Sequence, residues 1–311
     1  MAARSVGRDR ARLLAAGMAT VDNIYWLGNH PVEDTENRVA DYRAAVGAPA
    51  GRGAIAAARL GLDVALVATR GDDVFGQVLD GLLADEPLDR RLVVSAGPSQ
   101  QSCVIVAQDT GSRTTIWTAQ PAADERVDEI LRQELATACV VLTDTTDLRI
   151  LRTLHDAPKD SGVQVVVDTG DYPLEDPEVL RGVDFVIAPQ TFAARMADGR
   201  DTREWARAMR ASLDLTVLAV TEGDLGGWWV SATDHGRWEA RPADVVDTCG
   251  AGDAFHGAFA WAIAHGLAFD RAFDVASWVA SRHVSASGND GLPRRRELLD
   301  AAVVDLGELR Y

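Results

Sequence analysis

The segment from Asp247 to Phe259, DTCGAGDAFHGAF, places three glycines and two aspartates at the start of an apolar, helix-forming run. Successive glycines let backbone N–H groups converge, and the first turn of a helix adds partial positive charge, so this turn can hold an anion. Asp253 directly follows the turn Gly250–Gly252 and could accept a proton from a hydroxyl nucleophile. The same residues also fit a plain helix start with a capping Asp, and the glycines alone do not separate the two interpretations.

Glycine spacing argues against two common nucleotide-binding motifs. A G-x-G-x-x-G dinucleotide fingerprint counted from Gly250 would need a third glycine where Phe255 stands, and it should follow the first strand of the fold. The Walker string G-x-x-x-x-G-K-[ST] does not occur in the sequence. A nicotinamide-dependent oxidoreductase is therefore disfavoured.

The elements that would position this segment follow an alternating pattern. Short apolar runs alternate with amphipathic helical stretches, which predicts an α/β fold with a mainly parallel sheet covered by helices on both faces. The expected strands lie at 11–18, 64–69, 139–144, 163–168, 183–188 and 215–223. The expected helices lie at 51–60, 75–84, 147–157, 202–212, 252–265, 269–286 and 294–303.

Two segments do not fit the alternation. Residues 24–46 and 98–118 have β-type patterning, and the second contains a hairpin signal, DTGS, between two strand-like runs. We expect both to form a small β lid outside the main sheet. The whole is expected to be a single domain over residues 12–303, preceded by a flexible tail at 1–11.

Bulk composition limits the functional class. The 311-residue chain is 47% hydrophobic and 25% charged, as in a globular protein, and its net charge of −16 opposes general binding to nucleic acid or anionic membranes. Cys103, Cys139 and Cys249 lack the spacing of a zinc site or the density of a disulfide scaffold, which favours the cytoplasm. The apolar run LLAAGMA is too short to span a bilayer.

The motifs together resemble those of the ribokinase-like (PfkB) family of carbohydrate kinases. The segment at Asp247 is similar to the family signature D-T-x-G-A-G-D-x-F, and residues 47–77 are similar to its glycine-rich N-terminal block. Residues 221–227 resemble the strand and turn that contact nucleotide phosphate. The resemblance runs from about residue 13 to 303 and is closest to the ketose-type branch, which includes ketohexokinases and sulfofructose kinases. It implies a three-layer α/β/α sandwich with a small β-sheet lid.

The resemblance also implies an activity and roles for particular residues. The activity is ATP-dependent phosphorylation of a hydroxyl, preferably a primary one, on a sugar or sugar-like molecule. Asp253 would be the general base, and the amides of Gly250, Ala251 and Gly252 would form the anion hole. The residues implied on the sugar side are Asp22, Gly47 and Arg52. Those implied on the nucleotide side are Thr221, Gly223, Asp247, Thr248 and Asn289.

The expected small molecules and partners follow from the same resemblance. ATP would act with Mg²⁺, and a monovalent cation such as K⁺ is a further candidate near Asp247 and Thr248. We expect no nucleic-acid or membrane partner. Because exposed sheet edges seek partners, a homodimer through the β lid is expected.

Two departures from the family pattern bear on substrate and metal use. Arg52 stands where the family usually has Asn; it suits a carboxylate, phosphate or sulfonate on the substrate, or else is an exposed helix-start arginine paired with a nearby acid. The family's N-x-x-E element, which helps arrange magnesium, is replaced by a segment that begins Pro189-Gln190, and no metal ligands are identified. These departures leave open a non-catalytic sugar- or nucleotide-binding sensor on the same fold.

Other polar and aromatic residues have weaker claims. His256 follows Asp253 by three positions and either faces the same site or packs the helix. Trp228 and Trp229 are expected to pack in the core. The sequence does not name the sugar.

Overall fold

The computed structural model describes residues 11–110, 112–121, 124–156, 162–305, 307 and 309. The expected tail at 1–11 lies outside these residues except for Ala11. Among the described helices, none has the length and apolar character needed to cross a membrane.

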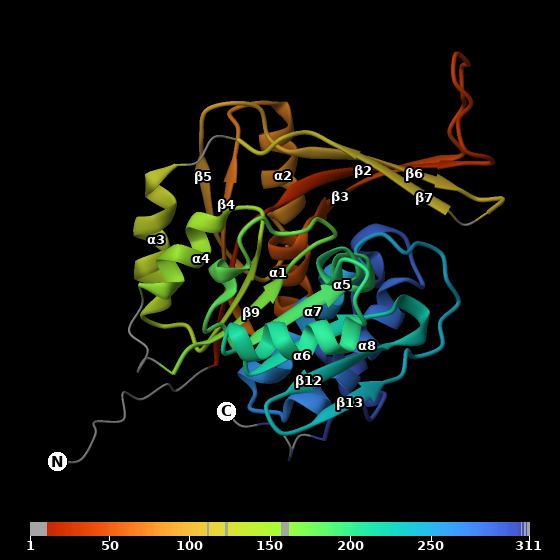
Figure 1. Ribbon diagram of the computed structural model, residues 1–311. Helices are drawn as coiled ribbons and strands as arrows, with labels where there is room; N and C mark the ends of the chain where they lie inside the picture. Colours follow the sequence, from red (N-terminus) through yellow and green to blue (C-terminus); the bar gives the residue numbers. More distant parts are fainter. Residues whose placement is uncertain are drawn as a thin grey trace.

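A nine-stranded sheet forms the centre of the molecule, in the order β13-β12-β11-β10-β9-β8-β1-β4-β5 (Figure 1). The seven neighbouring strands β11-β10-β9-β8-β1-β4-β5 pair in parallel. Strands β12 and β13 pair antiparallel at one edge of the sheet. The strands are β1 (Arg12–Ala16), β4 (Asp63–Arg70), β5 (Asp89–Val94), β8 (Val140–Asp144), β9 (Gln164–Asp168), β10 (Phe185–Pro189), β11 (Val217–Thr221), β12 (Gly227–Ser231) and β13 (His235–Trp238).

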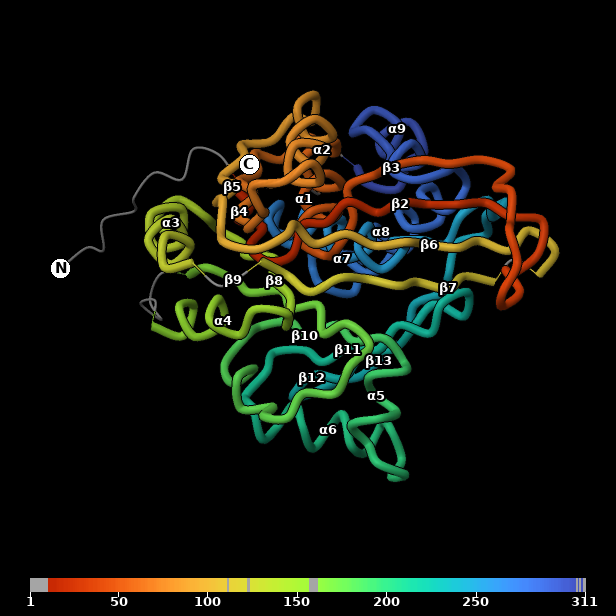
Figure 2. Tube along the Cα trace, turned by 90° about the horizontal axis from the view of Figure 1, so that it is seen from above, coloured from red at the N-terminus to blue at the C-terminus, as the bar shows by residue number. Residues whose placement is uncertain are grey.

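Helices cover both faces of this sheet. Successive residues of a strand point to opposite faces, so the apolar strands place side chains that must be buried on both sides. Leu13 of β1 packs in one hydrophobic cluster and Leu14 in the other. Figure 2 shows α1, α2 and α9 on one side of the sheet and α4, α5 and α6 on the other. The helices are α1 (Pro49–Arg59), α2 (Val74–Leu83), α3 (Glu125–Leu135), α4 (Leu148–His155), α5 (Gln190–Ala197), α6 (Thr202–Ser212), α7 (Ala251–Ala264), α8 (Phe269–His283) and α9 (Arg295–Asp300). The predicted three-layer α/β/α class is confirmed.

Strands β5 and β13 and helices α3 and α5 were not predicted. Strand β13, HGRW, is only four residues long and lies at one edge of the sheet. Strand β5, DRRLVV, is an edge strand with three charged residues, so it lacks the apolar run that marks the central strands. Helix α3 buries only Val127 and Leu131, and α5 begins after Pro189 without a side-chain cap. Each therefore lacks one of the signals by which an element is found in a sequence.

A four-stranded sheet in the order β3-β2-β6-β7 stands against one end of the body. It consists of β2 (Thr20–Leu27), β3 (Asp41–Gly47), β6 (Gln101–Ala107) and β7 (Ser112–Trp117). These strands run side by side in Figure 2 and extend beyond the main sheet in Figure 1. We call this sheet the lid; the predicted lid segments, 24–46 and 98–118, overlap all four strands.

The inner face of the lid rests on the glycine-rich signature. Cys249 packs in one buried cluster with five lid residues: Ile24, Trp26, Ala45, Val104 and Val106. Arg113 on β7 donates a hydrogen bond to the Thr248 carbonyl at 2.8 Å. Lid and signature are thus in direct contact.

Candidate active site

The signature lies beyond the carboxyl ends of the parallel strands, where the strand order reverses. From β1 the chain proceeds to β4 and β5 on one side, then returns to β8 and continues to β9, β10 and β11 on the other. Such a switch point leaves a crevice in which open α/β sheets bind ligands. The loop after β1 is held to the end of β8 there, since Met18 N donates to Asp144 Oδ2 at 2.8 Å.

The Gly250–Gly252 turn opens α7 as the signature suggests. Gly250 has a φ of 77°, in the left-handed region that favours glycine, and Asp253 lies in the first helical turn. The first helical bond is donated by Ala254 N to Gly250 O at 3.0 Å, so the earlier amides precede the helical ladder. Ala251 N makes only a long contact of 3.4 Å with Thr248 O.

The space beside this turn is open. A Cβ added at Gly252 would have no protein atom within 4 Å. Amides at a helix N-terminus next to open space form a ready site for a phosphate or other anion. The start of α7 therefore has open space on the side of Gly252.

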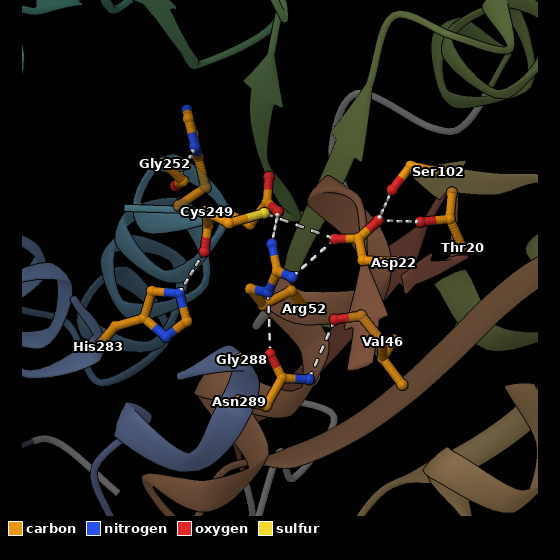
Figure 3. Close-up of polar contacts among 12 residues, drawn as sticks. Thr20, Asp22, Val46, Arg52, Ser102, Cys249, Gly252, His283, Gly288 and Asn289 are labelled. Carbon is orange, nitrogen blue, oxygen red and sulfur yellow. Dashed lines mark hydrogen bonds and ion pairs between the residues drawn. The ribbon is translucent and has the colours of Figure 1, made fainter. Parts of the chain in front are cut away.

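Arg52 lies between two carboxylates at the floor of the site (Figure 3). Its Nη1 is 2.8 Å from Asp253 Oδ2, its Nη2 is 2.8 Å from Asp22 Oδ2, and its Nε donates to Asn289 Oδ1 at 2.9 Å. The side chain is only 1% exposed. Residues from α1, β2, α7 and the 3-10 helix η4 (Gly288–Gly291) are thus tied together by one guanidinium.

The structure decides one of the two interpretations of Arg52 from the sequence. The expectation that Arg52 is exposed is wrong, because its side chain is buried. The expected pairing with acidic residues is present. Helix α1 packs against α7, and Arg52, on the buried part of α1, reaches its acidic partners inside the protein. Three of its five N–H donors face protein acceptors.

Asp22 is held from both of its oxygens. Oδ1 accepts from Thr20 Oγ1 at 3.0 Å and from Ser102 Oγ at 2.7 Å, and Oδ2 accepts from Arg52. A Cβ on Gly47 would lie 2.1 Å from Asp22 Oδ2, so the position opposite this carboxylate has to be glycine. Asp22 is a fixed acceptor at the rim between lid and body.

Burial shifts the titration of the groups around Arg52. Burial raises the pKa of Asp253, and the carboxylates of Asp168 and Asp22 act in the same direction, while the guanidinium of Arg52 opposes them. Burial raises the pKa of the Cys249 thiol to about 12, which leaves it uncharged. Burial of Arg52 itself is outweighed by the facing acidic groups, so its pKa is raised and the guanidinium stays charged.

The residues expected on the nucleotide side fall into two groups. Thr221 ends β11 and Gly223 follows in a turn with a φ of 62° and no atom near an added Cβ. Asp247 accepts from Cys249 N at 2.8 Å and Gly288 N at 3.2 Å, which joins the signature to η4. The side chain of Asn289 accepts from Arg52 and donates to the Val46 carbonyl, so it is directed toward α1 and β3.

Within the described ranges, no group of three or more His, Cys, Asp or Glu side chains is arranged to hold a metal ion. Pro189 and Gln190 stand at the end of β10 and the start of α5. Among the described residues, the segment at Pro189-Gln190 thus adds no such cluster to the site.

His256 anchors α7 to the sheet instead of reaching the Asp253 carboxylate by a hydrogen bond. Its Nδ1 lies 2.6 Å from Gly252 O and 3.1 Å from Asp168 Oδ2, and its Nε2 lies 3.2 Å from Ile187 O. The helix-packing interpretation is therefore supported. Trp228 and Trp229 are buried, as expected for core residues.

Three polar residues near the site were not singled out in the sequence. Ser102 and Thr20 orient Asp22, and His283 contacts the Cys249 carbonyl through Nε2 at 2.8 Å. Ser102 can be recognised as a partner of Asp22 only once the pairing of β2 with β6 is known, because that pairing places the two residues opposite each other. No local motif marks any of them.

Comparison with known proteins identifies the family of this chain. The family described as pfkB family carbohydrate kinase matches residues 21–294. The chain is 25% identical over 271 residues to a ribokinase of Haemophilus influenzae, covering 84% of this chain and 88% of that one. It is 30% identical over 231 residues to a probable fructokinase-2 of Arabidopsis thaliana, covering 68% and 70%.

Solved structures share the fold. The ribokinase of Giardia lamblia superposes with a TM-score of 0.83 at 19% identity, covering 94% of this chain and 98% of that one. The Arabidopsis thaliana ribokinase complexed with ribose and ATP superposes with a TM-score of 0.77 at 22% identity, again covering 94% and 98%. Together with the family match, the signature at the start of α7 shows that this chain belongs to the pfkB family of carbohydrate kinases and is a sugar kinase.

Proposed function

We propose that this sugar kinase transfers the terminal phosphoryl group of ATP to a hydroxyl, preferably a primary one, of a sugar or sugar-like molecule. The observation that carries the proposal is the position of Asp253. It lies in the first turn of α7 beside the open Gly250–Gly252 turn and across Arg52 from Asp22. A proton acceptor, an anion site and a hydroxyl-binding carboxylate are the groups that phosphoryl transfer to an alcohol requires.

In this proposal Asp253 is the general base. Its carboxylate takes the hydroxyl proton while the sugar oxygen forms its bond to phosphorus and the bond from phosphorus to the leaving oxygen breaks. The amides of Gly250, Ala251 and Gly252, together with the N-terminus of α7, stabilise the negative charge on the transferring group. ATP, when bound, supplies the phosphoryl group.

The sugar is proposed to lie between the lid and the signature. Asp22 accepts hydrogen bonds from its hydroxyls, and Gly47 leaves room for that carboxylate. Arg52, which is 1% exposed and bound to both carboxylates, would act on the sugar through Asp22 and Asp253. Since Asp22 and Asp253 carry two negative charges against the one positive charge of Arg52, we favour an uncharged group of the sugar at this place.

The nucleotide is proposed to lie over the end of β11 and the start of α7. Thr221, Gly223 and Thr248 would face its phosphates, and η4, including the backbone of Asn289, would border the base. Mg²⁺ with the nucleotide, and a monovalent cation such as K⁺ near Asp247, belong to the proposal. We derive no step through either metal.

We further propose that residues 12–303 act as one domain in the cytoplasm and that two copies pair through the lid. Strand β7 lies at the lid edge with Ile116 61% and Trp117 54% exposed, and such an edge favours strand-to-strand association. Light scattering at micromolar concentration tests the pairing. A dimer that Ile116→Lys converts to a folded monomer is expected, whereas a wild-type monomer would refute lid pairing.

The activity itself is tested by ADP release over a panel of ketoses, aldoses, nucleosides and anionic sugars. Turnover with at least one sugar, lost in Asp253→Asn, is expected. Calorimetry of the same sugars with and without ATP separates the alternative of a non-catalytic sensor. Sugar binding without ATP binding or turnover would favour the sensor and reject the kinase.

A further inference from the structure

We propose that Arg52 is a positioning residue for the general base: it holds the carboxylate of Asp253 ionised and at a fixed separation from Asp22. The proposal rests on the proposed function, because it gives Asp253 the role of base. It assigns to Arg52 a task within the protein that precedes any contact with substrate.

The first argument is geometric. The guanidinium joins segments that lie far apart in the chain, with sequence separations of 30 residues to Asp22, 201 to Asp253 and 237 to Asn289. A guanidinium is planar and presents its donors in a rigid fork, so partners on three of its edges cannot move independently. The distance between the sugar-side carboxylate and the base is thereby set by one side chain.

The second argument concerns space. A Cβ on Gly250 would lie 1.6 Å from Arg52 Nη1 and 2.2 Å from its Cζ. The signature turn therefore closes directly over the guanidinium, and the glycine is required by Arg52 as well as by its positive φ. Arg52 thus packs against the backbone of the Gly250–Gly252 turn, and the turn can adopt this position only with glycine at 250.

The third argument is electrostatic. The titratable and charged groups that act on Asp253 come from the elements around it: Asp22 on β2, Arg52 on α1, Asp168 on β9 and His256 on α7. Burial and the two carboxylates raise the pKa of Asp253, and Arg52 is the larger of the two opposing influences. Without Arg52, two buried carboxylates would share the site without the cation that lies between them, and a proton would be bound more readily.

The effect expected from a lost cation has a definite sign. A general base works only when ionised, so the rate falls as the pH drops through its pKa. Removing Arg52 raises that pKa further. The acid limb of the pH profile must then move to higher pH.

The test compares pH profiles of kcat/KM and kcat for wild type, Arg52→Met and Arg52→Lys, with the best sugar of the panel. For Arg52→Met we expect the acid limb to move up by at least about one pH unit and the plateau kcat to fall. Arg52→Lys keeps the charge but not the fork, so its limb should stay near that of wild type while kcat falls about tenfold or more. An unmoved limb in Arg52→Met, or wild-type kcat in Arg52→Lys, would overturn the proposal.

Arg59→Met is the matched control. Arg59 lies two turns further along α1 and is paired with Glu86. Its Nη1 also donates a hydrogen bond to the backbone carbonyl oxygen of Asn289 at 2.6 Å. Arg59→Met likewise removes an ion pair from α1, but the hydrogen bonds of Arg59 run to Glu86 and Asn289, not to Asp253. Its pH limb should coincide with that of wild type, and an equal shift would assign the effect to general damage.

A second readout does not depend on turnover. The Cγ resonance of Asp253 in protein labelled with ¹³C-aspartate, assigned by its loss in Asp253→Asn, reports its titration in wild type and in the Arg52 variants. A higher midpoint in Arg52→Met supports the proposal, and an equal one refutes it. If Arg52→Met does not fold, the same titration is carried out on Arg52→Lys. A titration midpoint of Asp253 near that of wild type, together with a lower kcat, supports the proposal, and any other result refutes it. If wild type phosphorylates no sugar, the proposed function fails, while the titration still shows whether Arg52 sets the ionisation of Asp253.

Discussion

Arg52 on α1 and Asp253 on α7 form an ion pair of 2.8 Å with side-chain exposures of 1% and 16%. The pair joins the glycine-rich block near the N-terminus to the signature near the C-terminus. Removal of one partner would leave the other as a buried charge, which is more costly than the loss of a surface salt bridge. The two motifs that mark the family in sequence therefore meet as one electrostatic unit in the structure.

The Gly250 turn gives a prediction for stability. Gly250→Ala forces a side chain into the left-handed region and against the Arg52 guanidinium, so we expect a loss of at least about 2 kcal/mol in the free energy of unfolding. Urea unfolding followed by circular dichroism measures it. Gly252→Ala is the control, because its Cβ would meet open space within a helix, and it should be neutral or slightly stabilising. Equal losses in both variants would contradict the steric argument.

Asp22 should act on sugar binding more than on chemistry. Asp22→Asn keeps the shape but removes the charge that accepts sugar hydroxyls, so we expect KM for the sugar to rise about tenfold or more, with a smaller change in kcat. KM for ATP should change little. Asp41→Asn, at the exposed start of β3, should leave both constants unchanged. A fall in kcat alone, with KM for the sugar unaltered, would contradict a sugar-binding role.

His283 should make the fold sensitive to acid. Burial lowers its pKa to about 4 from the ordinary 6.5, so the unfolded state binds the proton first as the pH falls. Its contribution, about 3 kcal/mol, is fully present above pH 6.5 and is lost between pH 6.5 and 4. Unfolding free energies of wild type and His283→Gln across this range test it. The difference between the two proteins should shrink as the pH falls, and a constant difference would be inconsistent with a buried neutral imidazole.

Asp144 acts in the opposite direction within the same experiment. Burial raises its pKa to about 6 from 3.8, so the folded state takes up this proton before the unfolded state does as the pH falls. Protonation of Asp144 between pH 6 and 3.8 therefore raises the free energy of unfolding. The acid dependence of wild type alone is thus a sum of opposing contributions. The comparison with His283→Gln removes the contribution of Asp144, because that residue is common to both proteins.

Local sequence signals were enough for the main features of fold and site. The continuous apolar runs predicted the central parallel strands, and the order of residues in DTCGAGD placed Asp253 in the first turn of α7 beside the glycine turn. Both depend on near neighbours in the chain. That is why they can be read without the structure.

The partners of Arg52 could not be predicted in this way. Its type and place were noticed, but its burial follows from the packing of α1 against α7, a contact across 201 residues of sequence. The same holds for Ser102, which reaches Asp22 only through the pairing of β6 with β2. Strand β5 was missed for a different reason: at the sheet edge its charged residues are tolerated, so the apolar pattern of a buried strand is not needed.

The most direct test of the central claim is the kcat of Asp253→Asn with the sugar that wild type turns over fastest. Calorimetry of that sugar confirms that the variant still binds it. The account predicts a fall in kcat of at least about a hundredfold with sugar affinity largely retained, because only the proton acceptor is lost. A kcat within about threefold of wild type would contradict the assignment of Asp253 as the general base.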